Sequence, residues 1–158
     1  MAILARAPSA GGKARLTADL DASRALRLRE ALLLDTLAAV TAAGEAVTVF
    51  VTPAAYVTEV SSLLGGGVTV QPQCDGDLGA RMSRAMETLF VSGATRVVLV
   101  GSDLPAIPSS RIADAFAALH EGWDLVLGPA EDGGYYLVGA SRPQPSVFEG
   151  ISWEVRRC

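Results

Sequence analysis

The sequence has few of the residue types that several classes of enzymes and binding proteins need. His120 is the only histidine in the sequence, which argues against a histidine-rich metal site. The sequence also has no serine in a nucleophile-elbow motif, which argues against a Ser-His-Asp triad. Its two cysteines, Cys74 and Cys158, lack CxxC spacing, so we interpret both as free thiols. The net charge is -4 and no basic run is present, so nucleic acid is not an expected partner.

Long apolar runs are also missing. None approaches the length of a membrane span, and the apolar stretch at the N-terminus is too short for a signal peptide, so we expect a cytoplasmic protein. Apolar residues nevertheless make up 50% of the 158 residues. This is ample for the core of one domain, and we predict a single domain over 1–158.

The apolar residues are arranged in short β-branched runs that alternate with longer segments of helical period. This alternation is typical of βαβ units and predicts an α/β fold, a three-layer, doubly wound, Rossmann-like structure with a mostly parallel sheet. We expect strands at 2–7, 46–51, 68–71, 96–101, 124–128 and 135–140. We expect helices at 23–43, 53–64, 77–93 and 109–121.

Capping residues suggest where two of the helices begin. Thr52 followed by Pro53 is typical of an N-cap and a first helical residue. Asp77 is the expected cap of the third helix, in which Leu78, Met82 and Met86 are expected to face the core.

Ligands of a parallel sheet bind beyond the carboxyl ends of its strands. Asp103 directly follows a buried strand, in a loop that Pro105 keeps from forming a helix, so we predict that it contacts a ligand. The alternative is an aspartate that only accepts hydrogen bonds from the backbone amides of its own turn.

The loop after the fifth strand carries two further acids, Glu131 and Asp132, followed by two glycines. Carboxylates from two adjacent loops suit Mg²⁺, which takes one or two protein oxygens and completes its shell with water and substrate phosphates. We therefore predict a metal site at Asp103 and Asp132.

The loop after the first strand supplies the opposite charge. Gly11 and Gly12 allow backbone amides to approach an anion, and Lys13 and Arg15 follow them. The spacing is not that of a P-loop, and a surface turn with two solvated cations is an equally good interpretation. Cations on one loop and acids on two others are what a metal-bound nucleoside phosphate requires.

Three more residues are assigned to nucleotide or phosphate binding: Ser102, Asp77 and Arg81. For Asp77 the role of helix cap is favoured. Arg81 either reaches a phosphate or base, or pairs with Asp77 at i,i+4 spacing. Tyr135 and Tyr136 are neighbours in a strand, so only one of them is expected to face the crevice.

Six motifs in this order, "GGKARL", "LLLDTL", "GDLGARM", "GSDLP", "LGPAEDGGYYLVG" and "ISW", resemble the bacterial glycosyltransferase-like proteins known as radical-SAM/selenodomain-associated transferases. The resemblance implies a glycosyltransferase-A-like fold of the nucleotide-diphospho-sugar transferase superfamily. It also implies that Asp103 binds the Mg²⁺ or Mn²⁺ that bridges nucleotide phosphates. The Lys13 and Arg15 loop would then lie against the phosphates, and the loop from Glu131 to Gly134 would border the acceptor.

The sequence departs from this family in two places. Ala14 stands where the family commonly has threonine, which removes a hydroxyl contact. The chain also stops soon after "ISW", where relatives usually continue with another helix, so we expect a truncated or incompletely represented C-terminus and an incomplete acceptor pocket.

Together the motifs predict a metal-dependent transferase that uses an activated nucleotide, with Glu131 or Asp132 as an alternative base toward an acceptor hydroxyl. Glycosyl transfer from a nucleoside diphosphate sugar is slightly favoured by the family, whereas the Asp-x-Pro turn favours nucleotidyl transfer with release of pyrophosphate. A nucleotide-binding module without turnover is a third hypothesis. A receiver domain with Asp103 as phosphoacceptor is disfavoured, because no acidic cluster follows the first strand. The expected partners are a nucleotide or nucleotide sugar and a small-molecule acceptor of unidentified class.

Overall fold

The computed structural model describes residues 1–12, 14–105, 107–131 and 133–151, with the side chains of Arg15 and Leu16 outside the description. In these residues six strands form one sheet in the order β3-β2-β1-β4-β6-β5. The strands are β1 (Ala2–Arg6), β2 (Thr48–Thr52), β3 (Thr69–Pro72), β4 (Val97–Gly101), β5 (Leu125–Pro129) and β6 (Tyr135–Ala140). Only β6 runs antiparallel to its neighbours, so the mostly parallel α/β sheet is confirmed.

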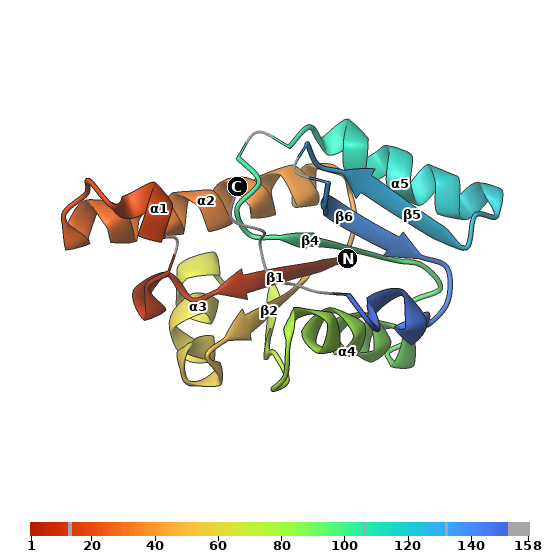
Figure 1. Ribbon diagram of the computed structural model, residues 1–158, viewed down its shortest axis with the longest axis horizontal. Coiled ribbons are helices and arrows are strands. Elements are labelled where there is room, and N and C mark those ends of the chain that lie inside the picture. The colour runs from red at the N-terminus through yellow and green to blue at the C-terminus, as the bar shows by residue number, and fades with distance from the viewer. Residues whose placement is uncertain (13, 106, 132, 152–158) are drawn as a thin grey trace.

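Helices cover both faces of the sheet, as the three-layer prediction requires (Figure 1). One face packs against α2 (Ala22–Ala42), α3 (Val57–Leu64) and α5 (Ser109–Glu121). The other packs against α4 (Leu78–Val91), with Phe148 of a short 3₁₀ helix at Pro145–Phe148 beside it. No helix in the described part of the chain has both the length and the apolar composition needed to cross a membrane.

The central strands are buried on both faces, which explains why they are continuous apolar runs in the sequence. Ile3 of β1 belongs to the core under α2 and α5, whereas its neighbour Leu4 belongs to the core under α4. The side chain of Ile3 has no exposed surface, and such burial contributes about 1.5–3 kcal/mol.

The ends of the helices follow their capping residues. The Asp77 carboxylate accepts a hydrogen bond from the amide of Ala80 at 2.8 Å, so its predicted role as the cap of α4 is confirmed. Asp21 caps α2 in the same way, through the amide of Arg24 at 2.8 Å. Helix α5 ends at Gly122, whose φ of 108° is easily reached only by glycine.

Two helix starts differ from the prediction. Thr52 is the last residue of β2, where it pairs with Arg6 of β1, and a 3₁₀ helix at Ala54–Tyr56 precedes the start of α3. Sheet pairing therefore prevails over the capping preference of the threonine. Leu78 is 40% exposed instead of buried, and it lines a hollow at the carboxyl end of the sheet.

The segment 8–22, expected to be irregular, contains two short helical turns. A 3₁₀ helix spans Pro8–Ala10 and α1 spans Ala14–Thr17. Both lie between the end of β1 and the start of α2, so the glycine loop is part of a short folded connection.

Candidate functional site

The order of the strands creates a crevice between β1 and β4. From β1 the chain moves outward to β2 and β3, then crosses to the other side of β1 to form β4. The helices that follow β1 and β4, α2 and α5, cover the same face, but the chain continues from them to strands on opposite sides, β2 and β5. Ligands of open α/β sheets bind where the strand order reverses in this way. The glycine loop and the Asp103 loop, which we predicted to meet, are the two loops that flank it.

The glycine loop is held by an arginine at the end of β1. Arg6 donates two hydrogen bonds, from Nε to the carbonyl of Gly11 at 3.1 Å and from a terminal nitrogen to the carbonyl of Ala10 at 3.0 Å. Gly12 has a φ of 98°, and a Cβ at this position would lie 2.9 Å from Cδ of Arg6. The positive φ favours glycine at position 12, and any larger residue would also require the side chain of Arg6 to shift.

A second arginine holds the same loop from α2. Arg29 donates from Nε to the carbonyl of Pro8 at 2.8 Å. Neither Arg6 nor Arg29 was predicted, and the only signal in the sequence is a charged residue at the end of an otherwise apolar strand. Lys13, which was predicted to contact phosphate, lies outside the described residues, as does the side chain of Arg15.

Asp103 lies where the sequence placed it, exposed in the loop after β4. A Cβ on Gly101 would lie 3.2 Å from its Oδ1, so the glycine that ends β4 gives this carboxylate room. Its neighbour Ser102 is only 7% exposed and lines neither of the hollows described below.

The Asp103 loop is tied to α2 by a buried threonine. Thr36 has no exposed surface, and its hydroxyl donates to the carbonyl of Leu32 at 2.9 Å and accepts from the amide of Leu104 at 3.4 Å. Thr36 belongs to the "LLLDTL" motif, but its role depends on a residue 68 positions away. No local pattern predicts such a contact.

Two hollows meet at Asp103. The α4-side hollow, of about 370 Å³, lies toward α4, and its lining includes Leu4, Leu78, Met82, Gly101, Asp103, Gly134 and Tyr135. The α5-side hollow, of about 510 Å³, is lined by Asp103, Leu104, Pro105, Ile107, Pro108, Arg111, Pro129 and Tyr136. Asp103 is therefore accessible from both faces of the sheet.

The two adjacent tyrosines pack on opposite faces of the sheet: Tyr135 lies against the core under α4 and Tyr136 against the core under α2 and α5. This is the alternation expected in a strand, although both residues contribute to the lining of the α4-side hollow. Tyr136 also lines the α5-side hollow, where its ring lies on Gly128: a Cβ there would be 2.7 Å from Cζ of the tyrosine.

The loop between β5 and β6 is closed by its own backbone. The amide of Ala130 donates to the carbonyl of Gly134 at 2.9 Å, and the amide of Gly133 donates to Ala130 at 3.1 Å. Glu131 is exposed on this turn, while Ala130 and Gly134 line the α4-side hollow. Asp132 lies outside the described residues, so its pairing with Asp103 at a metal stays a prediction.

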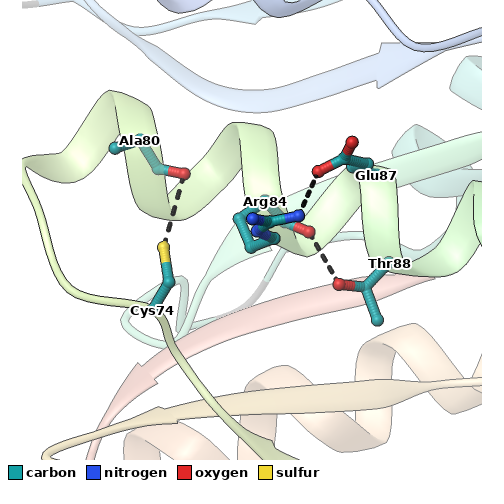
Figure 2. Close-up of polar contacts among 5 residues, drawn as sticks. All are labelled: Cys74, Ala80, Arg84, Glu87 and Thr88. Atoms are coloured by element: carbon teal, nitrogen blue, oxygen red, sulfur yellow. Dashed lines mark hydrogen bonds and ion pairs between the residues drawn. The ribbon is translucent and has the colours of Figure 1, made fainter.

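The start of α4 is held by similar contacts. Arg81 donates from Nε to the carbonyls of Gly76 and Asp77, at 3.1 and 3.3 Å, so its contact with Asp77 is to the backbone and not to the carboxylate. Cys74 donates its thiol hydrogen to the carbonyl of Ala80 at 3.7 Å (Figure 2). These bonds join the loop after β3 to the first turn of α4, which borders the α4-side hollow.

The described residues offer few protein ligands for a divalent cation. Among them, no group of three or more His, Cys, Asp or Glu side chains is arranged to hold a metal. Asp103 supplies one carboxylate, and Mg²⁺ is commonly bound by one or two carboxylates together with substrate phosphates. This site therefore fits an ion that arrives with a phosphorylated substrate, rather than one held by the protein alone.

An open, doubly wound α/β sheet with a crevice at its β1/β4 switch point defines a Rossmann-like class of protein. Within this class, the chain belongs to the family described as "Uncharacterized protein conserved in bacteria (DUF2064)", whose model matches residues 34–155. The family resemblance drawn from the motifs is confirmed. The comparison with curated proteins gives no match.

Similar solved structures agree with this assignment. A crystal structure from Desulfovibrio desulfuricans G20, described as a "putative nucleotide-diphospho-sugar transferase", is 33% identical, with a TM-score of 0.85 over 96% of this chain and 68% of that one. Rv0371c from Mycobacterium tuberculosis H37Rv is 16% identical, with a TM-score of 0.58 over 95% and 75%. A cytidylyltransferase from Leptospira borgpetersenii serovar Hardjo-bovis is 16% identical, with a TM-score of 0.57 over 94% and 60%. At 16% identity the last two share the fold alone.

Proposed function

We propose that this protein is a transferase that uses an activated nucleotide, with glycosyl transfer from a nucleoside diphosphate sugar favoured. The observation that carries the proposal is the position of Asp103, at the carboxyl end of β4, beside the switch point and on the wall of both hollows. The 33% identical relative described as a nucleotide-diphospho-sugar transferase supports the same class of donor.

In this proposal the nucleotide occupies the crevice between the glycine loop and the α4-side hollow. Arg6 and Arg29 hold the glycine loop by its carbonyls before a ligand arrives, which lowers the entropy cost of binding. Lys13 and Arg15 are proposed to neutralise phosphate oxygens. Gly101 leaves room for the Asp103 carboxylate, and Thr36 anchors the loop that carries it.

Asp103, assisted by Asp132, is the proposed ligand of Mg²⁺ or Mn²⁺. A divalent ion bound there would stabilise the negative charge that develops on the leaving diphosphate. Glu131 or Asp132 is the proposed base toward the acceptor hydroxyl, and Glu131 is exposed on a turn whose ends line the crevice.

Nucleotidyl transfer is the second candidate. It is favoured by the Asp-x-Pro turn formed by Asp103 and Pro105. The two reactions differ in their products, since glycosyl transfer releases a nucleoside diphosphate and nucleotidyl transfer releases pyrophosphate.

The first test is a thermal-shift screen of nucleoside triphosphates and nucleotide sugars, each with and without Mg²⁺ or Mn²⁺. A ligand that binds only the native state raises the melting temperature by mass action. We expect a selective, cation-dependent rise that is lost in Asp103→Asn. The matched control is Asp114→Asn, which changes an exposed aspartate on α5 outside both hollows and should keep the rise.

The second test incubates the stabilising nucleotide with the protein and candidate acceptors, and measures the released product. Nucleoside diphosphate supports glycosyl transfer, and pyrophosphate supports nucleotidyl transfer. The transferase proposal fails if no nucleotide stabilises the protein, or if Asp103→Asn responds like the wild type. A binding module without turnover is indicated if stabilisation is present and neither product is formed.

A further inference from the structure

The two hollows at Asp103 both have mostly apolar walls, and among the described residues that line them the difference is one of charge, because Arg111 lines only the α5-side hollow. The α4-side hollow adjoins the switch point, where the proposed nucleotide binds. The α5-side hollow lies across Asp103 from it, and its wall is mostly apolar, with Pro105, Pro108, Pro129 and the ring of Tyr136. Flat, rigid groups of this kind suit the hydrocarbon or ring portion of a small molecule.

One cation faces this apolar wall. Besides Asp103, Arg111 is the only charged side chain among the residues that line the α5-side hollow in the described chain. It is exposed in the first turn of α5, and that turn contains no acidic residue. Asp114 lies three residues further along α5, but among the described residues no ion pair joins it to Arg111.

Arg111 also differs from the other arginines around the crevice. Arg6, Arg29 and Arg81 donate to backbone carbonyls and so serve the loops. In the described residues the guanidinium of Arg111 donates to no backbone carbonyl. Arg111 nevertheless lines the α5-side hollow of about 510 Å³, which Asp103 also lines. An arginine that is not engaged by the backbone retains its donors for a ligand, and guanidinium geometry matches a carboxylate.

We infer that the α5-side hollow is the acceptor subsite of the proposed transferase and takes a small hydroxylated carboxylic acid. The carboxylate binds Arg111, the apolar body lies against the prolines and Tyr136, and the hydroxyl lies toward Asp103. A carboxylate is favoured over a phosphate because its single charge is balanced by the single guanidinium. The inference rests on the proposed function, since only a transferase needs a second substrate at this position.

The transfer from a nucleotide sugar balances in this arrangement. The acceptor oxygen forms a bond to the anomeric carbon, and the bond from that carbon to the nucleoside diphosphate breaks with its electron pair on the diphosphate. The hydroxyl proton passes to Glu131, which the proposed function names as a base and which is exposed on the turn between β5 and β6.

The test uses two probes that differ only in charge, 4-hydroxyphenylacetate and 4-hydroxyphenylacetamide, titrated into the full chain and followed by NMR. We expect the wild type to bind the carboxylate about tenfold more tightly than the amide, as one charge-assisted contact provides. In Arg111→Gln the ratio should fall to near one. Arg84→Gln is the matched control, because Arg84 is an exposed arginine on α4 that pairs with Glu87 at 2.7 Å, outside both hollows (Figure 2).

Equal binding of both probes to the wild type, or a preference that persists in Arg111→Gln, would overturn the inference. The thermal shift with nucleotide, measured on the same samples, separates it from the proposed function. If the nucleotide shift is present and the preference for the carboxylate is absent, the acceptor inference alone fails. If the preference follows Arg111 and no nucleotide binds, the proposed function fails, and the assignment of the hollow to an acceptor fails with it.

Discussion

Each end of the sheet has a hollow and an arginine that donates to a backbone carbonyl, but the backbone that the arginine holds differs between the two ends. At the amino end a hollow of about 470 Å³ is lined in part by Arg96, Phe116 and the exposed His120. Arg96 donates from Nε to the carbonyl of Leu119 at 3.1 Å, in the last turn of α5. At the carboxyl end, Arg6 makes the same kind of bond to a glycine loop.

The volume of a hollow therefore does not identify a functional site. The amino-end hollow is larger than the α4-side hollow, but its arginine completes the end of a regular helix. The arginines at the carboxyl end instead hold loops and a single 3₁₀ turn, outside the long helices and the strands, and binding residues are commonly found on such connections. Changes at the amino end should therefore affect stability, and changes at the carboxyl end should affect ligand binding.

The largest effects are expected from a matched pair of arginine substitutions. Arg96→Met should lower the free energy of unfolding by about 1.5–3 kcal/mol, because the half-buried Leu119 carbonyl loses a charged donor. Arg6→Met should lower it by less than about 1 kcal/mol, since Arg6 is exposed, but should weaken nucleotide binding about tenfold as the glycine loop loses its anchor. Urea denaturation and calorimetric titration measure the two quantities. Equal nucleotide affinity in both variants would show that Arg6 contributes no more to ligand binding than Arg96 does.

The next effect concerns the anchor of the Asp103 loop. Thr36→Val should cost about 1–2 kcal/mol of unfolding free energy and weaken the cation-dependent nucleotide shift, because the amide of Leu104 loses its acceptor. Thr88→Val is the matched control, since the Thr88 hydroxyl makes the same bond to the carbonyl four residues earlier, at Arg84, without holding a distant loop (Figure 2). We expect the control to change stability by less than about 0.5 kcal/mol and binding not at all. A normal shift in Thr36→Val would show that the anchor has no bearing on the site.

A pair of glycine substitutions sharpens the same contrast. Gly12→Ala and Gly122→Ala both place a side chain at positive φ, 98° and 108°, which costs about 1 kcal/mol. At Gly12 the new methyl group would also meet Arg6, whereas at Gly122 it meets nothing within 4 Å. Denaturant midpoints should fall in both variants, and the nucleotide shift only in Gly12→Ala. An unchanged shift in that variant would argue that the loop does not contact the nucleotide.

The smallest effect is a pH dependence at Tyr135, on the wall of the α4-side hollow. Burial raises the pKa of this phenol above its ordinary value of 10.0. The unfolded chain therefore loses the proton first, so the contribution of Tyr135 to stability is complete below pH 10 and is lost as the pH rises through the folded-state pKa. Unfolding free energies measured on either side of pH 10 should fall less steeply in Tyr135→Phe than in the wild type. Identical slopes would mean that the phenol is as well solvated as in the unfolded chain.

Local sequence patterns predicted the regular elements well. Helix α5 and strand β6 have the predicted limits, 109–121 and 135–140, because helical spacing and an apolar run bounded by glycine are local signals. Strand β2 begins at Thr48 instead of residue 46, since Ala46 and Val47 are apolar but unpaired in the ladder to β1. Thr52 was misassigned because it pairs with Arg6 of β1, and Leu78 because it lines a hollow that only the folded chain forms.

The candidate site was predicted only in part. Local sequence was enough to place Asp103, the glycine pair Gly11 and Gly12, and the cap Asp77. Each of them follows the end of a strand or precedes the start of a helix. Arg29 and Thr36 could not, since their partners lie 21 and 68 residues away. Arg111 was missed for a related reason, because only the fold brings the first turn of α5 beside Asp103.

Local sequence patterns specify the succession of strands and helices along the chain and the loops that gather at the carboxyl edge of the sheet. Hydrophobic period, capping residues and chain direction are properties of short segments. The tertiary structure alone shows which arginines donate to backbone carbonyls, as Arg6, Arg29 and Arg96 do, and that Arg111 lines a hollow without such a bond in the described residues. A guanidinium looks the same in the sequence whether a distant carbonyl engages it or not, and the distance to that carbonyl exists only once the chain has folded.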